Sequence, residues 1–287
     1  MIVYQDGMNT VIAGVGNNFS LEDTLDCGQA FRWKKLDDGS FFGTAGARSL
    51  ALYADGDRIV LKNLSIEEYD AFWKSYFDMD RDYDALRKLF MDDPVLSRAV
   101  RYAPGIRVLN QDGWEALCSF IISSNNNISR IKNIIDKFCT LFGDEIPGGG
   151  FSFPSPERIA VLDVNDLDPI KCGFRARYII DCARRVSSKE IDLSAISSMP
   201  LEDARKSLCT ILGVGPKVAD CALLFGFGRS EAFPCDVWIK RAMQQLFPNG
   251  LPDYVLPWAG IAQQYIFHYV RNNPDCLDTQ AVSAADN

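Results

Sequence analysis

The sequence predicts an α+β protein, in which an N-terminal antiparallel β-sheet domain is followed by a helical domain. In the first part of the chain, short runs of β-forming residues alternate with turn signals, which is typical of consecutive hairpins. From Asp112 onward, apolar residues recur at the spacing of helices instead. Pro104 and Gly105 interrupt the helical pattern between the two regions. We therefore expect a sheet domain with flanking helices over residues 1–106 and a helical domain over residues 107–287.

The strands of the predicted sheet follow one another through tight turns. The segments Asp-Asp-Gly-Ser and Ala-Asp-Gly-Asp separate them, and both are hairpin signals. Consecutive hairpins imply an antiparallel sheet with one packed face and one wet face. Strands are expected at residues 10–15, 30–36, 41–44, 49–53 and 58–62.

Helices are expected on both sides of the domain boundary. Ser65 is followed three residues later by Glu68, a capping box that opens a helix running to about residue 77. Two shorter helices, 80–90 and 95–103, complete the first domain. The second domain is expected to end in a polar, frayed tail from Asp278. Its helices are expected at residues 114–124, 128–142, 155–162, 174–187, 201–212, 217–225, 236–247 and 258–271.

Composition is that of a globular protein with a sizeable core. The 287 residues are enough for two domains, and 47% of them are hydrophobic while 24% are charged. No apolar run reaches the roughly 20 residues that span a bilayer, and the N-terminus lacks the basic and apolar segments of an export signal. We therefore expect an intracellular monomer that does not contact a membrane.

Two counts bear on cofactors and partners. The nine cysteines include no Cys-x-x-Cys pair, so we expect neither zinc nor an iron–sulfur cluster. The net charge of −8 counts against binding nucleic acid through bulk charge. It still allows DNA binding through a local face that uses backbone amides and a few arginines.

Residues 208–241 carry the strongest functional signal. Gly213 and Gly215 form a tight turn between two helices, and Pro216 suits the first turn of the second helix. Unpaired N–H groups at such a helix start make an anion site. Lys217 lies in that first turn, where the helix dipole and partial burial favour the neutral, nucleophilic amine.

Asp236 completes this stretch as the natural N-cap of a later helix. Each feature alone has a simpler explanation: a non-specific phosphate grip, a solvated lysine at a helix end, and a plain cap. The combination of a hairpin L-x-G-V-G, a lysine just after it and a downstream P-x-D resembles the helix-hairpin-helix DNA glycosylase superfamily. The resemblance implies that Lys217 and Asp236 are catalytic and that Gly213 and Gly215 contact DNA.

The hairpin also resembles those that hold a monovalent cation. The resemblance implies that Na⁺ or K⁺ could bind the backbone carbonyls of Cys209, Ile211 and Val214 and link the hairpin to a phosphate. No cofactor is required by the chemistry of the family.

A second motif lies in the sheet domain. Gly28 opens the segment G-Q-x-F-R-W, which by itself indicates a bulge entering a strand. The segment resembles that of 8-oxoguanine DNA glycosylases, which implies that the Gly28 carbonyl accepts a hydrogen bond from N7–H of the oxidised base. Ordinary guanine has an acceptor at N7, so a carbonyl facing it would cost about 1–3 kcal/mol. We also place Gln29 among the DNA-contacting residues.

Two helical segments resemble the parts of the same family that read the DNA. Three asparagines followed by I-x-R-I resemble the gap-filling loop, which implies that Asn125 enters the space left by the flipped base and that Arg130 contacts the estranged cytosine. The segment G-F-R-A-x-Y resembles the family's G-Y-R-A-x-Y, which implies that Phe174 wedges between bases and that Arg175 hydrogen-bonds that cytosine. The residues alone indicate a helix connection and a solvated basic face.

The base pocket is expected from a late helix. Gln263 and Phe267 are four residues apart and share one helix face. By themselves they would be a capping amide and a core aromatic residue. The segment A-G-x-A-Q…F resembles that of the family, which implies that Phe267 and Cys221 sandwich the base while Gln263 bonds its Watson–Crick edge. The family often has a histidine where this chain has Trp238, and the single histidine, His268, is assigned a structural role.

Together, the motifs predict a bifunctional repair glycosylase that acts on double-stranded DNA. It would excise 8-oxoguanine through a lysine Schiff base and cleave the strand by β-elimination, after flipping the base out of the duplex. One alternative is an endonuclease III-like glycosylase for another oxidised base, which usually carries a C-terminal four-cysteine cluster. Only Cys276 lies beyond Cys235 here. The other alternative is a non-catalytic helix-hairpin-helix DNA-binding module.

Overall fold

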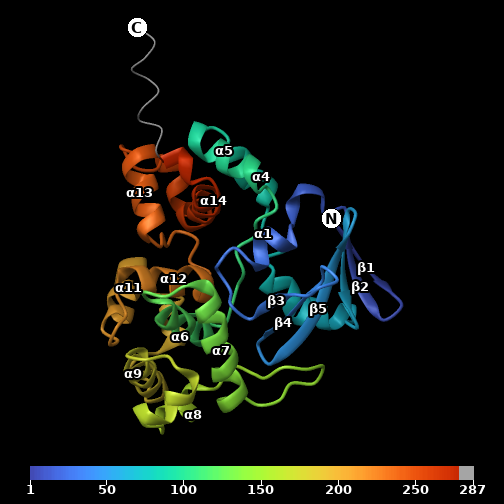
Figure 1. The fold of residues 1–287 in the computed structure, drawn as a ribbon. Helices are drawn as coiled ribbons and strands as arrows, with labels where there is room; N and C mark the ends of the chain where they lie inside the picture. Colours follow the sequence, from blue (N-terminus) through green and yellow to red (C-terminus); the bar gives the residue numbers. More distant parts are fainter. Residues whose placement is uncertain (278–287) are drawn as a thin grey trace.

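The computed structural model describes residues 1–277. A sheet lies on one side of the molecule and a larger body of helices on the other, as the α+β prediction expects (Figure 1). The polar tail expected from Asp278 lies outside the described residues. No helix among residues 1–277 is both long and apolar enough to cross a bilayer.

The sheet is antiparallel and has six strands in the order β1-β2-β6-β5-β4-β3. Five of them lie where the alternating pattern predicts strands. The edge strand β1 was not predicted, because all of its residues are exposed and it therefore lacks an apolar alternation. The bounds are β1 (Ile2–Asp6), β2 (Asn9–Ala13), β3 (Trp33–Lys35), β4 (Phe41–Ala45), β5 (Arg48–Asp55) and β6 (Arg58–Lys62).

The helix after the sheet covers its packed face. The Ser65–Glu68 capping box is present, and the helix continues as α2 (Ile66–Glu68), a π-helical segment η2 (Tyr69–Trp73) and α3 (Lys74–Tyr76). Its aromatic residues pack with Trp33 of β3, whose indole Nε1 donates a 2.9 Å hydrogen bond to the Tyr76 hydroxyl. This aromatic core fixes β3, and hence the Gly28 segment that leads into it.

The next two helices belong to the helical body. Both α4 (Tyr83–Phe90) and α5 (Pro94–Tyr102) precede the domain boundary expected after residue 106, which stays a prediction, and α5 packs along α14 (Ala259–Asn272), as Figure 1 shows. Their buried side chains share one core with the C-terminal helices rather than with the sheet. Sequence position suggested the first domain, but the apolar faces of these helices are buried against the second.

The helical body is built around α6, whose residues from Trp114 to Ile122 are all buried. It packs against α12, α7 and α9. The longer helices begin and end within a few residues of the predicted bounds, whereas the short elements, which are too brief to show periodicity, were missed. These longer helices are α6 (Gly113–Ser123), α7 (Ile128–Phe142), α9 (Arg175–Ser187), α11 (Leu201–Cys209), α12 (Pro216–Phe227), α13 (Val237–Leu246) and α14, and the short helix α8 (Pro156–Ala160) also lies where it was predicted. The missed elements are η1 (Gly16–Asn18), α1 (Leu21–Leu25), η3 (Val164–Ile170), α10 (Leu193–Ile196), η4 (Asp253–Trp258) and η5 (Pro274–Leu277).

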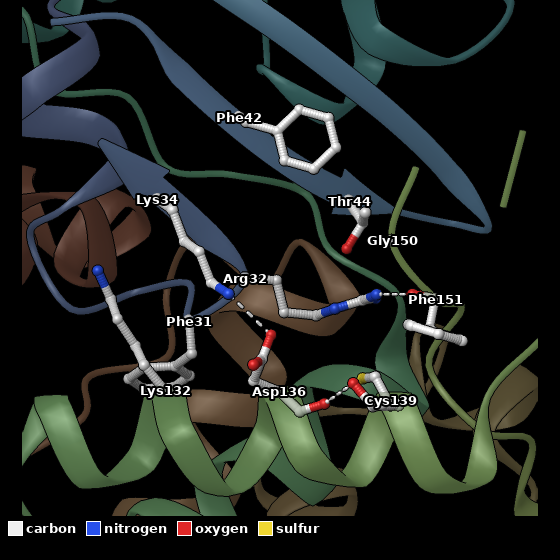
Figure 2. Close-up of a pocket in the computed structure, with 11 residues that line it drawn as sticks. Phe31, Arg32, Lys34, Phe42, Thr44, Lys132, Asp136, Cys139, Gly150 and Phe151 are labelled. Atoms are coloured by element: carbon white, nitrogen blue, oxygen red, sulfur yellow. Dashed lines mark hydrogen bonds and ion pairs between the residues drawn. The ribbon is translucent and has the colours of Figure 1, made fainter. Parts of the chain in front are cut away.

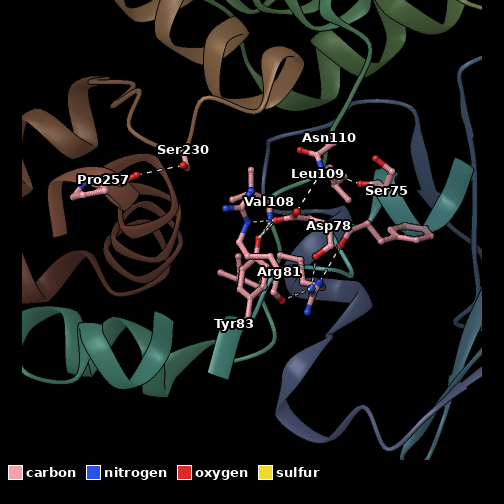
Figure 3. A network of polar contacts seen from close by, with 12 residues as sticks. Ser75, Asp78, Arg81, Tyr83, Val108, Leu109, Asn110, Ser230 and Pro257 are labelled. Carbon is pink, nitrogen blue, oxygen red and sulfur yellow. Dashed lines mark hydrogen bonds and ion pairs between the residues drawn. The ribbon is translucent and has the colours of Figure 1, made fainter. Parts of the chain in front are cut away.

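A polar network joins the sheet domain to the helical body (Figure 3). The Asp78 carboxylate pairs with Arg81 and accepts a 3.0 Å hydrogen bond from the Tyr83 hydroxyl. That hydroxyl in turn accepts a 2.8 Å hydrogen bond from the backbone N–H of Val108. Asn110 donates to the Ser75 carbonyl at 2.8 Å. The extended segment before α6 is thereby fixed to both halves of the molecule.

A cavity lies on the seam between β3, β4 and α7 (Figure 2). The Lys34 ammonium pairs with the Asp136 carboxylate at 2.9 Å, and Arg32 donates to the Phe151 carbonyl. Arg32 also forms a buried ion pair with Glu115 of α6, with Nη1 and Oε2 3.1 Å apart. These ion pairs hold the sheet domain and the helical body together along the seam. Because the charges here are neutralised in pairs, we place the candidate active site elsewhere.

Candidate active site

The hairpin between α11 and α12 has the geometry that the sequence predicts. Gly213 has a φ of 79°, and an added Cβ would lie 2.3 Å from Cδ2 of Tyr178, so no other residue fits. Gly215 faces open space and is the N-cap residue of α12. No side chain caps this helix, so its first N–H groups are available to an anion.

Lys217 and Asp236 lie on the wall of a single cavity. Lys217 is half-buried in the first turn of α12, and its Nζ lies 5.3 Å from the centre of the Phe120 ring. Asp236 is half-buried as well and caps α13, because its Oδ1 accepts a 2.9 Å hydrogen bond from Ile239 N–H. One amine and one carboxylate therefore reach the same space from the starts of two helices.

The same cavity collects the residues predicted to bind the base. It has a volume of about 50 Å³ and shares part of its lining with a wider cleft of about 330 Å³. All the predicted catalytic and base-binding side chains or backbone groups take part, although they come from distant parts of the chain. The cavity is lined by Gly28, Phe120, Lys217, Cys221, Phe225, Pro234, Asp236, Gln263, Gln264 and Phe267.

Gln263 carries an unsatisfied polar atom in this cavity. Its side-chain oxygen Oε1 is buried and has no hydrogen-bond partner among the described residues. A buried acceptor without a partner costs about 1–3 kcal/mol, and such a cost is commonly tolerated where a ligand supplies the missing donor. A ligand that presents an N–H or O–H group to Gln263 would satisfy this acceptor.

Cys221 and Phe267 supply apolar wall on the same cavity. Burial raises the pKa of the Cys221 thiol to about 11, and the nearby Lys217 offsets only part of this effect. The thiol therefore stays protonated at neutral pH and behaves as a small hydrophobe. A ring-shaped ligand can bury its faces against such a wall while its edge reaches Gln263.

Gly28 reaches the cavity from the sheet domain with a φ of 92°, a conformation that side-chained residues rarely adopt. An added Cβ would lie 3.5 Å from Cδ1 of Ile128 and 3.8 Å from Cε1 of Phe267. Backbone therefore comes close to the place where Phe267 lines the cavity, as the sequence predicts for a residue that recognises a ligand through its carbonyl.

The asparagine loop lies beside the wider cleft, between α6 and α7. Asn125 is exposed and has a φ of 49°, while Asn126 and Asn127 line the cleft. Asn127 caps α7 by accepting a 2.9 Å hydrogen bond from Arg130 N–H. The Arg130 side chain is exposed in the first turn of α7, directly after the loop. Asn125 and Arg130 are therefore both accessible to a large ligand.

Arg175 is buried, whereas a side chain that contacts a DNA base is expected to be exposed in the absence of DNA. Its Nε donates to the Ser124 carbonyl at 2.9 Å and its Nη2 to the Asn125 carbonyl at 2.8 Å. Burial, with a further contribution from the nearby Arg130, lowers the Arg175 pKa. In this structure Arg175 holds the loop that carries Asn125, and its predicted contact with an estranged cytosine stays a prediction.

Phe174 is accessible and suited to stacking. Its side chain is 50% exposed at the start of α9, packs edge-on against Tyr178 with ring centres 5.7 Å apart, and has the Arg175 guanidinium 4.5 Å from its ring centre. An exposed, supported aromatic ring can insert between bases.

Gln29 is buried, and its predicted contact with DNA stays a prediction. The side chain is only 1% exposed. Its Nε2 donates to the carbonyls of Thr24 at 2.9 Å and Arg107 at 2.8 Å, and its Oε1 accepts from Leu109 N–H at 2.8 Å. Sequence proximity to Gly28 suggested a surface role, but the amide instead ties the Gly28 segment to the extended segment before α6.

Sequence reasoning missed several residues that line the site. Phe120 lies within the apolar run of α6 and Gln264 beside Gln263, so neither gave a separate signal. Arg271 of α14 also lines the wider cleft, as does Trp238 of α13, which the sequence analysis had named at the position of the family's histidine. The helical spacing between Phe267 and Arg271, which places them on one face, could have indicated the arginine.

No group of three or more His, Cys, Asp or Glu side chains within residues 1–277 could hold a metal ion. The hairpin carbonyls proposed for a monovalent cation belong to a well-ordered turn, in which the Ile211 carbonyl already accepts a 3.1 Å hydrogen bond from Val214 N–H. A cation at Cys209, Ile211 and Val214 stays a prediction. His268 is structural, as predicted, because its Nε2 lies 3.4 Å from Asp23 Oδ1 of α1.

An unblocked helix-hairpin-helix, with a lysine and an aspartate on one cavity beside it, defines a helix-hairpin-helix DNA glycosylase. Residues 12–117 match the N-terminal domain of 8-oxoguanine DNA glycosylases, and residues 118–253 match the HhH-GPD superfamily of base excision DNA repair proteins. The chain belongs to the 8-oxoguanine DNA glycosylase family.

Solved structures and a curated relative support this assignment. MBOgg1 in complex with a low-affinity DNA ligand is 39% identical with a TM-score of 0.88, over 95% of this chain and 99% of that one. The Clostridium acetobutylicum 8-oxoguanine glycosylase/lyase, in complex with double-stranded DNA containing cytosine opposite 8-oxoguanine, is 33% identical with a TM-score of 0.88, over 96% and 99%. A probable N-glycosylase/DNA lyase of Methanothermobacter thermautotrophicus is 32% identical over 71% of this chain and 70% of its own.

Proposed function

We propose that this protein excises 8-oxoguanine from double-stranded DNA and cleaves the strand at the resulting abasic site. The observation that carries the proposal is the cavity shared by Lys217, Asp236, Gln263 and the backbone of Gly28. Lys217 provides a nucleophile and Asp236 a carboxylate. Gln263 provides a buried acceptor without a donor, and Gly28 brings the backbone close to the ligand space. The family members with solved structures include a glycosylase/lyase bound to DNA with 8-oxoguanine.

The first chemical step is displacement of the base by the lysine. The neutral amine of Lys217 forms a bond to C1′ of the sugar while the bond from C1′ to N9 breaks. The departing base keeps the electron pair of that bond and takes up a proton. Asp236 stabilises the positive charge that develops on the sugar, because a carboxylate fixed by a helix N-terminus needs no reorganisation during the reaction.

The second step cleaves the DNA strand. Ring opening of the sugar converts the amine adduct into a Schiff base, and loss of a C2′ proton then expels the 3′-phosphate by β-elimination. Water hydrolyses the Schiff base and restores Lys217. The lysine therefore serves both reactions, and an abasic site is a substrate even without a base in the cavity.

Recognition of the damaged base follows from the walls of the cavity. Phe267 and Cys221 cover the base faces, and Gln263 bonds the Watson–Crick edge. The Gly28 carbonyl accepts from N7–H, which guanine lacks. The opposite strand is contacted by Arg130, with Asn125 in the gap and Phe174 as the wedge. The backbone carbonyls of Cys209, Ile211 and Val214 would hold a Na⁺ or K⁺ ion, which would supply positive charge for a DNA phosphate at the hairpin. One chain supplies all of these groups, so we infer that a monomer is sufficient.

Borohydride trapping tests the proposal. The wild-type protein should form a covalent adduct on a duplex with 8-oxoguanine opposite cytosine, since borohydride reduces a Schiff base to a stable amine. The Lys217→Gln variant should give no adduct while it binds the same duplex with nearly unchanged affinity. A trapped adduct in that variant would assign the nucleophile to another residue. Absence of any wild-type adduct would favour a DNA-binding module without activity.

A further inference from the structure

Helix α14 has two functional faces. Gln263 and Phe267, four residues apart, line the cavity. Gln264, which also lines the cavity, and His268, four residues further along, contact the segment that leads to Gly28: His268 pairs with Asp23, and Gln264 hydrogen-bonds Cys27. Helix α14 therefore carries Gln263 and Phe267, which are proposed to bind the base, and it also holds the segment before Gly28, whose carbonyl is proposed to recognise N7–H.

The Gln264 contact is direct and buried. Its Nε2 lies 3.1 Å from Cys27 Sγ, and the two side chains are 2% and 1% exposed. The Cys27 thiol donates to the Thr24 carbonyl at 3.4 Å. Burial raises the pKa of Cys27 to about 11, so the thiol keeps the proton that this bond needs. Cys27 is therefore held on both sides, and it is not a reactive thiolate at neutral pH.

Gly28 itself has no side chain through which it could be held. Its position depends on its neighbours, and both are fixed by buried contacts: Cys27 by Gln264, and Gln29 by the carbonyls of Thr24 and Arg107. Gln29 also donates to Cys27 Sγ at 3.4 Å, which links the two neighbours. A flexible residue with a φ of 92° is thus kept in one conformation by contacts on either side of it.

We propose that Gln264 is a positioning residue for base recognition, which acts through Cys27 to hold the Gly28 carbonyl at the cavity wall. The Gln264 amide sets the distance between the Gly28 backbone and the cavity face of α14. Gly28 and the cavity face of α14 are then held in a fixed relation to each other. The Gly28 carbonyl therefore has its orientation before the base enters the cavity. This inference rests on the proposed function, because it concerns recognition of the oxidised base.

The test compares two substrates that share the lysine chemistry but not base recognition. One is a duplex with 8-oxoguanine opposite cytosine, and the other carries an abasic site at the same position. Single-turnover rates are measured with excess enzyme for wild type, Gln264→Met, Cys27→Ala and the double variant. Each single variant should slow excision of 8-oxoguanine about fivefold, the factor that one ordinary hydrogen bond contributes, while cleavage of the abasic duplex keeps its rate.

Two further variants separate positioning from general stability. Cys27→Ser keeps an acceptor for the Gln264 amide and a donor for Thr24, so it should restore excision. Tyr265→Phe removes a buried 3.3 Å hydrogen bond from the same helix to the Ile106 carbonyl, a contact that includes neither Cys27 nor Gly28. It should lower the melting temperature without changing the ratio of the two rates.

The double variant decides whether the two residues act through one contact. Its loss of excision should equal that of Cys27→Ala alone, because without the thiol the Gln264→Met change has no further contact with Cys27 to remove. Additive losses, equal losses on both substrates, or unchanged excision would each overturn the positioning role. A wild-type protein that cleaves the abasic duplex but leaves 8-oxoguanine in place would refute the proposed substrate instead, whatever the variants do.

Discussion

Lys217 and Asp236 face the same cavity although each occupies the start of a different helix, α12 and α13. The two helix starts differ in one respect. The start of α13 is capped by the Asp236 carboxylate itself, whereas no side chain caps α12. The carboxylate is therefore fixed by the fold, and the N–H groups beside the lysine are left for the DNA backbone.

Asp236 has two roles that a pair of substitutions can separate. Asn caps a helix as well as Asp does, so Asp236→Asn should keep the melting temperature while excision slows about 100-fold through loss of the negative charge. Asp236→Ala should lose the same activity and about 1 kcal/mol of stability as well. Thermal unfolding and single-turnover excision give the two readouts. Wild-type excision in Asp236→Asn would reduce Asp236 to a cap.

The two hairpin glycines should respond in opposite ways to substitution. Gly213→Ala should destabilise the protein, because its Cβ would collide with Tyr178 and its φ is positive. Gly215→Ser should not, since this residue faces open space with a φ of −100°. Its hydroxyl would instead cap the N–H groups of α12, and binding to undamaged duplex should weaken about fivefold, the factor of one ordinary hydrogen bond.

Chemical denaturation and a fluorescence binding titration measure these effects. A Gly215→Ser protein that is as stable as wild type and binds DNA equally well would show that the phosphate does not use the start of α12. An unstable Gly215→Ser protein would contradict the open geometry of the turn.

Local signals predicted most of the fold and most of the cavity. Apolar periodicity located the long helices, and hairpin signals located every strand except β1, whose exposed residues carry no pattern. The motifs named Lys217 and Gln263, which the structure brings to one cavity. Motif position could not show side-chain direction, which is why the burial of Gln29 was not predicted. That direction depends on tertiary contacts with residues far away in sequence, such as Arg107 and Leu109.

The long-range pairing of α5 with α14 was hidden for the same reason. Sequence order placed the helix with the sheet, but an apolar face does not specify its partner. The buried pair of Arg32 and Glu115 was likewise invisible, because nothing local links a strand entry to a helix so far along the chain.

Glu115 should give the stability of this protein a recognisable pH dependence. Burial raises the Glu115 pKa above its ordinary value of 4.5 by more than the neighbouring Arg32 lowers it. The folded protein then binds its proton more tightly than the unfolded chain does, so the unfolding free energy falls as pH rises from about 4.5 through the raised pKa. Glu115→Gln should remove this fall and be no less stable than wild type at pH 7.

Urea unfolding at a series of pH values checks this expectation. Glu115→Ala is the matched control, because it removes the oxygen to which Nη1 of the buried Arg32 donates and should cost about 3–5 kcal/mol. Identical pH profiles for wild type and Glu115→Gln would mean that the carboxyl group ionises as in water.

The unsatisfied oxygen of Gln263 predicts a trade between stability and activity. Gln263→Leu replaces the amide with an apolar group of similar size, so the buried acceptor without a partner is removed. The variant should unfold at a higher temperature, with a gain of about 1–3 kcal/mol, the cost of leaving a buried acceptor unpaired. Excision of 8-oxoguanine should fall in the same variant, because the base edge loses its acceptor, while cleavage of an abasic duplex should be retained. Since a mere core residue would not separate the three measurements, this pattern distinguishes a recognition group from a packing defect. Lower stability with unchanged excision would place the Gln263 amide in the core and leave the base edge to another residue.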